Sequence, residues 1–497
     1  MTPMRGNYFY NNEILADFQA RSKATLKGKE FVAADLPKQI GMPTIKPKSN
    51  TGKYFVEFAS SSTLHGLNHL VTPNRHPLEI LLALLFIIGA LVCLILLSFI
   101  FWDRYQNNAT VIVVDNNQEQ FKISKPALFI CPLPNVEYKK FPYVFKKYNI
   151  EHTPEAEKFF TFLSSATYEN MTETPLFDKV PADKWLEILY DLRQHVPNNI
   201  LKENDPYEGW ITTERGICFS TRSVVAVYAT LDYWRSNNWT TIPVPDELPY
   251  YNVDGVQENF GINCSALIGV CDPSELIVYD TPMKLAKSRT MQQGIISISE
   301  IKTTPNVEEL RIQQRKCKFL HDGGLETWPI YTRNMCITEC RMKVIQNHCN
   351  CRPHFARPID GINTCNVTQL RCIGRITNLL FLYEYPPPVC NCVPKCNVVT
   401  YQVGITENAE FYDTPVNLSV MNLIVEFPQV IYYRTMLYGF TDFLTSVGGA
   451  AGLFLGASVL SFVEIFYYCS LHVCFYIKRN KQKQKQKQKQ KTNVTIN

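Results

Sequence analysis

Two long uncharged stretches dominate the pattern of hydrophobic and polar positions along the chain. Residues 80–102 form 23 consecutive positions without a charge. A helix rises 1.5 Å per residue, so this stretch exceeds the roughly 30 Å hydrocarbon core of a bilayer. Residues 443–463 form a second uncharged run of 21 positions, and after Glu464 the chain stays uncharged over 465–477. The pattern predicts two membrane spans, of which the second is too long for one straight helix.

The charges that flank the two spans predict their orientation. Residues 1–41 carry acidic and basic side chains throughout, which is unlike a secretory signal peptide. Lys and Arg crowd the segment before the first span, and residues 478–491 contain eight of them and no acid. The positive-inside rule therefore places both termini in the cytosol. We expect a plasma-membrane protein that crosses the bilayer twice, with its middle segment outside the cell.

Glycosylation sequons agree with this topology. Six of them fall between the two spans, at Asn108, Asn170, Asn238, Asn263, Asn366 and Asn417. Asn493 also fits the pattern, but on this topology it faces the cytosol and stays unmodified. The sequons predict a glycosylated extracellular domain.

Five segments follow from these features: a cytosolic arm (1–76), a first span (77–102), an extracellular domain (103–437), a second span (438–477) and a basic tail (478–497). Inside the extracellular domain, β-branched runs at 109–115, 397–405 and 421–427 predict strands. Residues 182–196 place Trp185, Leu189, Leu192 and Val196 at helical spacing. We expect a mixed α+β domain with helices packed around a central sheet.

The tail alternates Lys with Gln and cannot bury a core, so we expect it to be disordered. The simpler interpretation is a solvated stop-transfer tail. The alternative is contact with anionic lipid of the plasma membrane, where each basic residue near the surface contributes about 1 kcal/mol.

The chain contains 17 cysteines, and an even number lies outside the spans. These are Cys131, Cys218, Cys264, Cys271, Cys317, Cys336, Cys340, Cys349, Cys351, Cys365, Cys372, Cys390, Cys392 and Cys396. In an oxidising compartment this count predicts seven disulfides. Zinc is the alternative for clustered cysteines, but extracellular thiols oxidise and no repeated CxxC motif is present. We expect no metal and no cofactor.

Spacing constrains part of the disulfide connectivity. Cysteines 336 and 340 on a helix are about 6 Å apart along its axis, and cysteines 390 and 392 on an extended strand are about 6.6 Å apart. The two matching rows predict a ladder of Cys336 with Cys392 and Cys340 with Cys390, closed on the outside by Cys317 with Cys396. Two further pairs would nest inside it, Cys349 with Cys372 and Cys351 with Cys365.

Several segments together resemble the degenerin and epithelial sodium channel superfamily. They are SSTLHGLNHL before the first span, KPALFICPLPN, TERGICFS, the cysteine ladder with CNCVPKCNVVTY, and SVGGAAGLFLGASVLSFVEIFYY in the second span. The ladder and the GICFS block are most similar to the insect pickpocket branch. The resemblance implies a homo- or heterotrimer with related subunits that conducts sodium ions. It also implies gating from the extracellular side by a stimulus or ligand that the sequence leaves unknown.

The resemblance also implies roles for residues of the second span. Gly456, Ala457 and Ser458 match the selectivity filter, where the helix breaks and backbone carbonyls with a hydroxyl replace water around the ion. Gly452 matches the position of the blocker amiloride, and Thr445 matches a position where bulky side chains hold the channels open. A simpler reading of Gly448, Gly452 and Gly456 is close helix packing through small residues, and both readings can hold.

Charged and polar residues near the spans complete the implied site. Asp442 and Glu464 are expected to attract cations at the two ends of the second span, although Glu464 could instead lie in a helix end beyond the membrane. His65 and Gly66 match a pair that affects gating from the cytosolic side, although a His-Gly pair is also common in a turn.

Two departures from acid-sensing members argue against proton gating. The local pair Cys264 and Cys271 follows the GICFS block here, and no Trp precedes Cys317. Cys131 with Cys218 remains the natural further pairing.

Other classes of protein fit less well. ATP-gated receptors are also two-span trimeric cation channels but lack the GGAAGLFLGAS tract. A non-conducting regulatory subunit that acts as a membrane-tethered receptor remains an alternative. No GxSxG, HExxH or paired-carboxylate motif is present, so we expect neither an enzyme nor a nucleic-acid partner.

Overall fold

The computed structural model describes residues 50–73, 75–117, 121–196, 206–236, 240–244, 248–381, 390–410 and 418–494. The chain divides into two compact units. One comprises residues 94–450, and the other combines residues 1–93 with 451–497. Each unit is described by itself.

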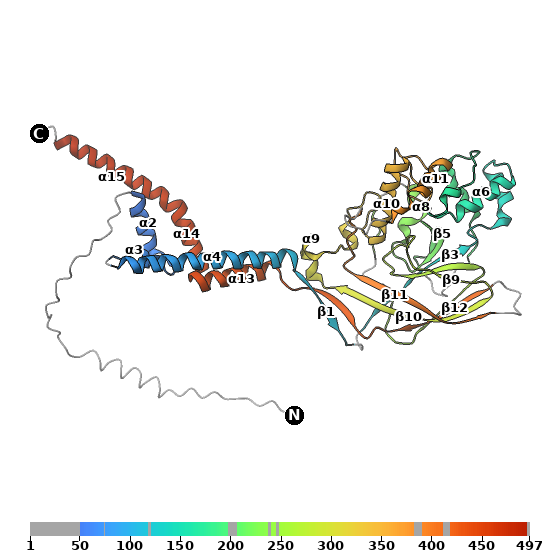
Figure 1. The fold of residues 1–497 in the computed structure, drawn as a ribbon, viewed down its shortest axis with the longest axis horizontal. Helices are drawn as coiled ribbons and strands as arrows, with labels where there is room; N and C mark the ends of the chain where they lie inside the picture. Colours follow the sequence, from blue (N-terminus) through green and yellow to red (C-terminus); the bar gives the residue numbers. More distant parts are fainter. Residues whose placement is uncertain are drawn as a thin grey trace, which may run out of the picture. The chain divides into compact units, whose positions relative to one another are not determined.

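A six-stranded sheet forms the base of the unit at 94–450 (Figure 1). Its strands are β1 (Thr110–Asp115), β7 (Gln257–Ile262), β10 (Thr290–Thr303), β11 (Val398–Glu410), β12 (Ser419–Glu426) and β13 (Ile431–Met436). They lie in the order β1-β13-β10-β12-β7, and β11 pairs with β10. β10 is the longest strand, and it runs parallel to both β12 and β13 while β11 is antiparallel to it. The predicted strands at 109–115, 397–405 and 421–427 correspond to β1, β11 and β12.

A five-stranded sheet lies above it, in the order β4-β5-β3-β8-β9. Its strands are β3 (Ala127–Leu133), β4 (Gly209–Thr213), β5 (Gly216–Thr221), β8 (Ser265–Cys271) and β9 (Lys284–Ala286). A two-stranded ladder joins β2 (Ile123–Ser124) to β6 (Tyr250–Tyr251).

The alternation of side chains along β3 explains how the layers pack. Leu128 and Ile130 point into a core shared with β10 and β12 of the large sheet. Ala127 and Phe129 point the other way, into a second core built with the helices. Because successive side chains on a strand face opposite sides, a strand buried on both faces separates two cores. The unit is therefore layered as large sheet, small sheet and helices.

The helices of this unit cover the small sheet and its flank. They are α5 (Phe141–Lys147), α6 (Pro154–Ser164), α7 (Trp185–Leu192), α8 (Leu231–Ser236), α9 (Ile312–Arg315), α10 (Arg333–Cys349), α11 (Val367–Arg375) and α12 (Thr377–Leu380). The helix predicted at 182–196 is shorter than expected, because α7 ends at Leu192 while Val196 lies buried beyond it. The expected mixed α+β domain is thus present among the described residues, with two large sheets and a two-stranded ladder in place of one central sheet.

Six disulfides tie this unit together. They join Cys131 to Cys218, Cys317 to Cys396, Cys336 to Cys392, Cys340 to Cys390, Cys349 to Cys372 and Cys351 to Cys365. The ladder differs from the expectation in one respect, since Cys390 and Cys392 lie in an irregular segment and not in a strand. The helical row Cys336 and Cys340 on α10 still matches it in spacing.

The expected seventh disulfide, between Cys264 and Cys271, is absent from the described residues, and that prediction is wrong. Cys264 directly precedes β8 and Cys271 is its last residue, so the strand separates their Cα atoms by about 23 Å at 3.3 Å per residue. A disulfide requires Cα atoms within about 7 Å. Burial raises the pKa of the Cys264 thiol to about 11 and that of Cys271 to about 12, so both remain protonated.

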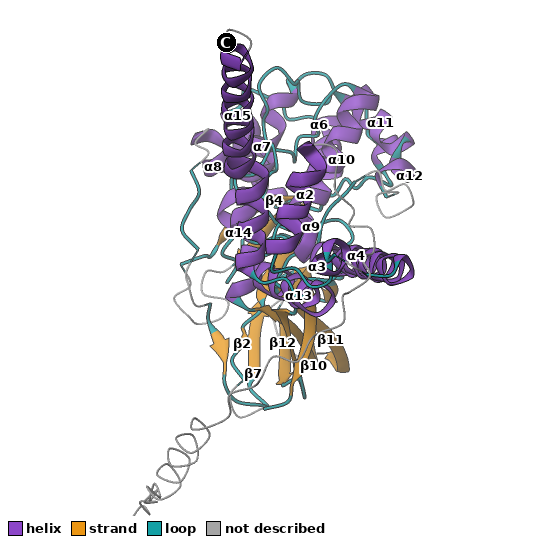
Figure 2. Cartoon of the chain, turned by 90° about the vertical axis from the view of Figure 1, so that its left-hand side faces the viewer, coloured by secondary structure: helices purple, strands orange, loops and turns teal. Residues whose placement is uncertain are grey.

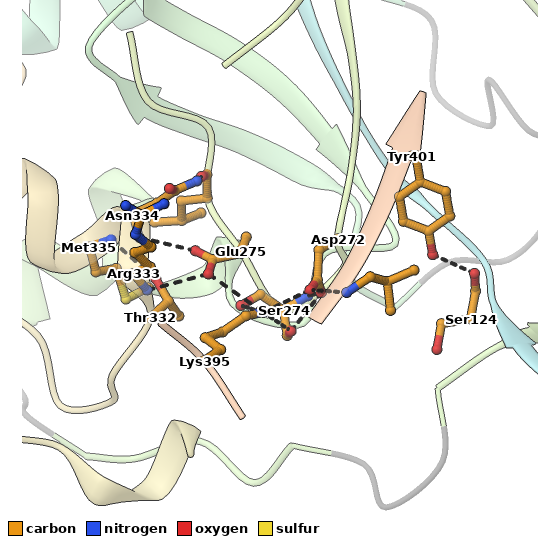
Figure 3. A network of polar contacts seen from close by, with 12 residues as sticks. Ser124, Asp272, Ser274, Glu275, Thr332, Arg333, Asn334, Met335, Lys395 and Tyr401 are labelled. Carbon is orange, nitrogen blue, oxygen red and sulfur yellow. Dashed lines mark hydrogen bonds and ion pairs between the residues drawn. The ribbon is translucent and has the colours of Figure 1, made fainter. Parts of the chain in front are cut away.

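A buried charged network joins three parts of this unit (Figure 3). Lys395 Nζ lies 2.8 Å from Asp272 Oδ2 and 3.5 Å from Glu275 Oε1. Glu275 also accepts hydrogen bonds from the backbone N–H groups of Arg333 and Asn334, the first residues of α10. Asp272 accepts one from the backbone N–H of Val399 in β11. The network therefore connects the end of β8, the start of α10 and the segment that enters β11.

Burial sets the pKa directions in this network, and Lys395 modifies them. Burial raises the pKa of Glu275 in spite of the nearby ammonium. Burial also disfavours the charge on Asp272, but attraction to Lys395 and hydrogen bonds from Lys395 and Ser274 together outweigh it, and the pKa of Asp272 falls below its usual value. Burial opposes the charge on Lys395, yet the two carboxylates raise its pKa. Lys395 and the surrounding hydrogen bonds thus offset part of the burial that disfavours charge on the two carboxylates.

The membrane helices connect to paired strands through short links. α4 (Pro77–Asn107) ends two residues before β1, and α13 (Phe440–Leu455) begins three residues after β13. β1 and β13 pair antiparallel, and the N–H groups of Leu437 and Tyr438 both donate to the Ala109 carbonyl, at 2.8 and 3.1 Å. The links from α4 to β1 and from β13 to α13 are therefore short and hydrogen-bonded to each other.

The other unit contains the remaining helices of the spans and of the N-terminal arm. They are α2 (Asn50–Ser61), α3 (Leu67–Val71), α14 (Val459–Tyr467), the π-helical turn η9 (Tyr468–His472) and α15 (Val473–Val494). Among the described residues, two helical stretches are long and apolar enough to cross a membrane, Pro77–Asn107 and Val459–Lys483, and Phe440–Leu455 is a shorter apolar helix.

The expectation of a disordered tail is wrong, because residues up to Val494 continue the helix α15. Lys and Gln both have good intrinsic helix propensity. Starting a helix is the unfavourable step, and here the apolar span has already nucleated it. Low complexity therefore excluded a packed core but did not exclude a helix.

Candidate pore and gating site

The second span breaks at the three small residues that the sequence singled out. α13 ends at Leu455, residues 456–458 are non-helical, and α14 begins at Val459. Gly456 has φ of +59°, and its N–H donates to the Gly452 carbonyl at 2.9 Å. A left-handed residue with this bond is a common way to end a helix, and glycine adopts it without strain.

A capping box starts the helix again on the other side of the break. The Ser458 hydroxyl accepts from the Ser461 N–H at 3.3 Å, and the Ser461 hydroxyl accepts from the Ser458 N–H at 3.1 Å. Ser461 is 1% exposed, and its N–H and hydroxyl both take part in hydrogen bonds with Ser458. The local sequence thus encodes one helix end and one helix start within three residues.

The N-terminal arm supplies a residue to this break. The backbone N–H of His65 donates to the Leu455 carbonyl at 2.9 Å, a carbonyl that the break has freed. A Cβ placed on Gly456 would lie 1.3 Å from Nδ1 of the His65 ring. Gly456 is therefore required both for its backbone conformation and for the space that the imidazole occupies.

Gly66 turns the chain directly after this contact. It has φ of +94° and precedes α3 as its N-cap. A Cβ at Gly66 would lie 3.1 Å from Cγ1 of Ile87 in α4. The His-Gly pair thus combines a residue that contacts the break with one that allows the turn.

Glu464 is held by the same arm. Its Oε2 accepts hydrogen bonds from the N–H of Thr63, at 3.2 Å, and from the Thr63 hydroxyl, at 2.8 Å. The Thr63 hydroxyl also lies 2.8 Å from the Ser461 hydroxyl. The carboxylate is therefore half-buried against the arm.

Asp442 and Thr445 occupy the other end of the span, in α13. Asp442 Oδ2 accepts the backbone N–H of Gly439 at 2.8 Å, so this carboxylate stabilises the start of the helix. The Thr445 hydroxyl donates to the carbonyl of Thr441 in its own helix at 2.7 Å. Both side chains remain exposed in the single chain.

The sequons lie at varied positions. Asn108, Asn263 and Asn366 are exposed, and Asn170 is half-buried. Asn366 also caps α11, and its Oδ1 accepts the N–H of Gln369 at 2.9 Å. Asn238 and Asn417 lie outside the described residues.

Sequence reasoning missed the residues that attach the arm to the second span. Thr63, Ser461 and Tyr54 belong to no recognisable sequence motif. Their partners are about 400 positions away, at sequence separations of 398 to 414. The only local signal was the Ser-x-x-Ser spacing of the capping box after the glycine.

Aromatic side chains gather where the spans leave the base sheet. Trp102 packs edge-on against Phe443 at 5.4 Å between ring centroids, and Tyr105 stacks on Phe443 at 5.8 Å. The Arg104 guanidinium lies 5.0 Å from the ring centroid of Tyr438. Such a belt is typical of a membrane–water interface.

The sequence pattern of one protein family, described as amiloride-sensitive sodium channel, matches residues 58–468. Pickpocket protein 19 of Drosophila melanogaster is 21% identical over 475 residues, which cover 82% of this chain and 88% of that protein. Pickpocket protein 28 of the same species is 25% identical over 188 residues, 34% of this chain and 31% of its own length. Human acid-sensing ion channel 2 is 27% identical over 162 residues, 29% of this chain and 31% of that channel.

Among solved structures, a proton-activated chloride channel aligns with 78% of this chain and 97% of its own. The sequence identity is 8% and the TM-score 0.23, which is too low to support any argument. The family assignment rests on the sequence match, which includes the His-Gly pair, the cysteine ladder and the broken span. The chain belongs to the amiloride-sensitive sodium channel family, whose members are two-span ion channels of the plasma membrane and not enzymes.

Proposed function

We propose that this chain is a pore-forming subunit of a sodium-selective cation channel, assembled as a homo- or heterotrimer. Both termini face the cytosol, and an extracellular stimulus or ligand opens the pore. The observation that carries the proposal is the break at residues 456–458, where three small residues interrupt a membrane helix. Carbonyl and hydroxyl oxygens at such a break can replace the water around a small cation.

Each remaining site residue has a role in this proposal. Asp442 and Glu464 raise the local concentration of cations, because carboxylates near a narrow path attract positive charge. Gly452, at the end of the bond from Gly456, is the site of amiloride block. His65 and Gly66 couple the N-terminal arm to the filter, and Thr445 controls the open state through its size.

The test uses cells that express the chain with Thr445→Phe, which should hold the pore open. Sodium is replaced outside by a large organic cation, and the shift in reversal potential reports selectivity. Ser458→Ala should reduce the preference for sodium by at least threefold, since the filter loses a hydroxyl. Ser446→Ala in α13 serves as the matched control.

Surface labelling normalises the currents of all variants. An unchanged reversal potential in Ser458→Ala, with normal surface amounts, would contradict the filter assignment. Gly452→Ala should weaken amiloride block by at least tenfold while the sodium current persists. Absence of current at normal surface density would instead favour a non-conducting, regulatory subunit.

A further inference from the structure

The second span contains a feature that ion selectivity does not explain, the π-helical turn η9 at Tyr468–His472. A π turn accommodates one residue more than an α turn and is rare, because its hydrogen bonds are less favourable. It persists where other groups stabilise the backbone that it displaces. The contacts of this turn with the N-terminal arm identify such groups.

One hydroxyl contacts both ends of the π turn. The Tyr54 hydroxyl of α2 donates to the carbonyl of Tyr468, the first residue of the turn, at 2.6 Å. The same oxygen lies 3.2 Å from Nδ1 of His472, the last residue of the turn. Because the single hydroxyl proton goes to the carbonyl, the hydrogen bond with His472 requires the Nδ1–H form of the ring as donor. The two bonds are therefore mutually consistent.

The rest of α2 packs on the same turn. The Ser61 hydroxyl lies 2.8 Å from the Tyr468 hydroxyl, and the Phe58 ring meets the Tyr468 ring edge-on at 5.2 Å. Tyr54, Phe58 and Ser61 follow the spacing i, i+4, i+7, so they lie on one face of α2. Figure 2 shows α2 beside α14, the helix that leads into the turn. One face of α2 is thus dedicated to η9.

We propose that α2 clamps the π turn and that Tyr54 is a positioning residue for the inner part of the second span. If the turn reverted to α geometry, every residue beyond it would rotate by about 100° and shift by about 1.5 Å. Tyr54 therefore sets which side chains after His472 face the conduction path. The clamp itself does not depend on sodium selectivity, and only its effect on current rests on the function proposed above.

The chain carries a reporter for this rotation. Cys474 is exposed and lies two residues beyond the turn, and Cys93 and Cys469 are the other exposed thiols of the described residues. In the full-length protein with Cys93→Ser and Cys469→Ser, the rate of Cys474 modification by a maleimide measures its surroundings. Loss of one hydrogen bond shifts a two-state equilibrium by about fivefold to tenfold. Tyr54→Phe should accordingly change the modification rate by at least threefold.

Tyr467→Phe is the matched control, because the Tyr467 hydroxyl has no hydrogen bond among the described residues. It removes the same atom one position before the turn and should leave the rate unchanged. Ser61→Ala, which removes a weaker part of the clamp, should have an intermediate effect. Equal rates in Tyr54→Phe and in the parent protein, with normal size-exclusion profiles, would overturn the proposal.

Currents provide the second readout. In the Thr445→Phe background, Tyr54→Phe should change open probability at least twofold and leave sodium preference unaltered. A changed thiol rate without any current in all variants would contradict the channel function and retain the clamp. A normal current with an unchanged thiol rate would contradict the clamp alone.

Discussion

Gly456 shows how one residue can satisfy two demands at once. Its positive φ ends a helix, and its missing Cβ leaves room for the His65 ring. The first demand can be read from a glycine inside an apolar span. The second cannot, because the histidine is almost 400 positions away and only the fold brings it there.

Substituting Gly456→Ala should therefore reduce current per surface channel by at least tenfold. The double variant with His65→Ala relieves the collision but not the backbone strain, so it should recover part of the loss. Gly452→Ala, at an α-helical position with nothing nearer than 3.7 Å, should be mild in comparison. Whole-cell current normalised to surface labelling measures all three. Equal loss in the single and double variants would show that the imidazole is irrelevant.

Glu300 offers a residue-scale prediction about pH. It lies on β10, is 3% exposed, and has Lys302 Nζ 3.5 Å from its Oε2. Burial raises the pKa of Glu300 to about 7 despite the attraction of Lys302. Between about pH 4.3, the usual value in unfolded chains, and pH 7, the folded protein binds more protons than the unfolded one. The stabilisation that protonated Glu300 contributes is thus fully present below about pH 4.3 and is lost as the pH rises towards 7.

Glu300→Gln should reduce the change in the free energy of unfolding between pH 4.5 and 7.5, by up to about 3 kcal/mol. Chemical denaturation of the full-length protein in detergent at several pH values measures this difference. Glu426→Gln on the neighbouring strand β12 is the control, because Glu426 is exposed. An unchanged slope in Glu300→Gln would refute the assignment of the titrating group.

At the scale of elements, the start of α10 depends on a charge that belongs to another segment. Glu275 accepts two backbone N–H groups of α10, and Lys395 balances its charge. Lys395→Met would leave two buried carboxylates without a cation, and we expect a destabilisation of about 3–5 kcal/mol. Lys343→Met removes a half-exposed partner of Glu339 on α10 and should cost less than about 1 kcal/mol. Thermal unfolding of both variants tests the contrast, and similar losses would contradict it.

The elements themselves divide into those that pattern predicts and those that it does not. β1, β11 and β12 follow from β-branched runs. The pairs of the disulfide ladder also follow from the spacing of cysteines, although the strand expected at Cys390 and Cys392 is an irregular segment. The separation of Cys264 from Cys271 could not be foreseen, because it requires knowing that residues 265–271 form a strand between two others. The helix in the tail was not predicted, because low sequence complexity shows only that a segment cannot form a packed core. Whether such a segment is helical depends on the helix propensity of Lys and Gln and on the preceding helix that it continues.

At the scale of the whole molecule, the topology makes a direct prediction. Asn170 lies in the extracellular domain and Asn493 in the cytosolic tail of the proposed arrangement. Treatment with a glycosidase should increase the electrophoretic mobility of the expressed chain. Asn170→Gln should make this increase smaller by the contribution of one glycan. Asn493→Gln should leave the mobility unaltered. A glycan on Asn493 would invert the proposed orientation.

At this scale the two apolar stretches were the most predictable feature, since both correspond to helices that are long and apolar enough to cross a membrane. The least predictable level was the return of the N-terminal arm to the second span. That return depends on hydroxyl groups such as Thr63 and Tyr54, which look ordinary in the sequence. Polar contacts of this kind carry no periodic signal, because each partner is found only in three dimensions.

The short links at β1 and β13 limit how any outside signal travels inward. Six residue pairs lock these strands in register, and only two and three residues separate them from α4 and α13. A paired ribbon resists stretching and sliding, because either would break several backbone bonds together, but it twists easily. The paired strands β1 and β13 can therefore transmit a rotation to α4 and α13 more readily than a displacement along the strands.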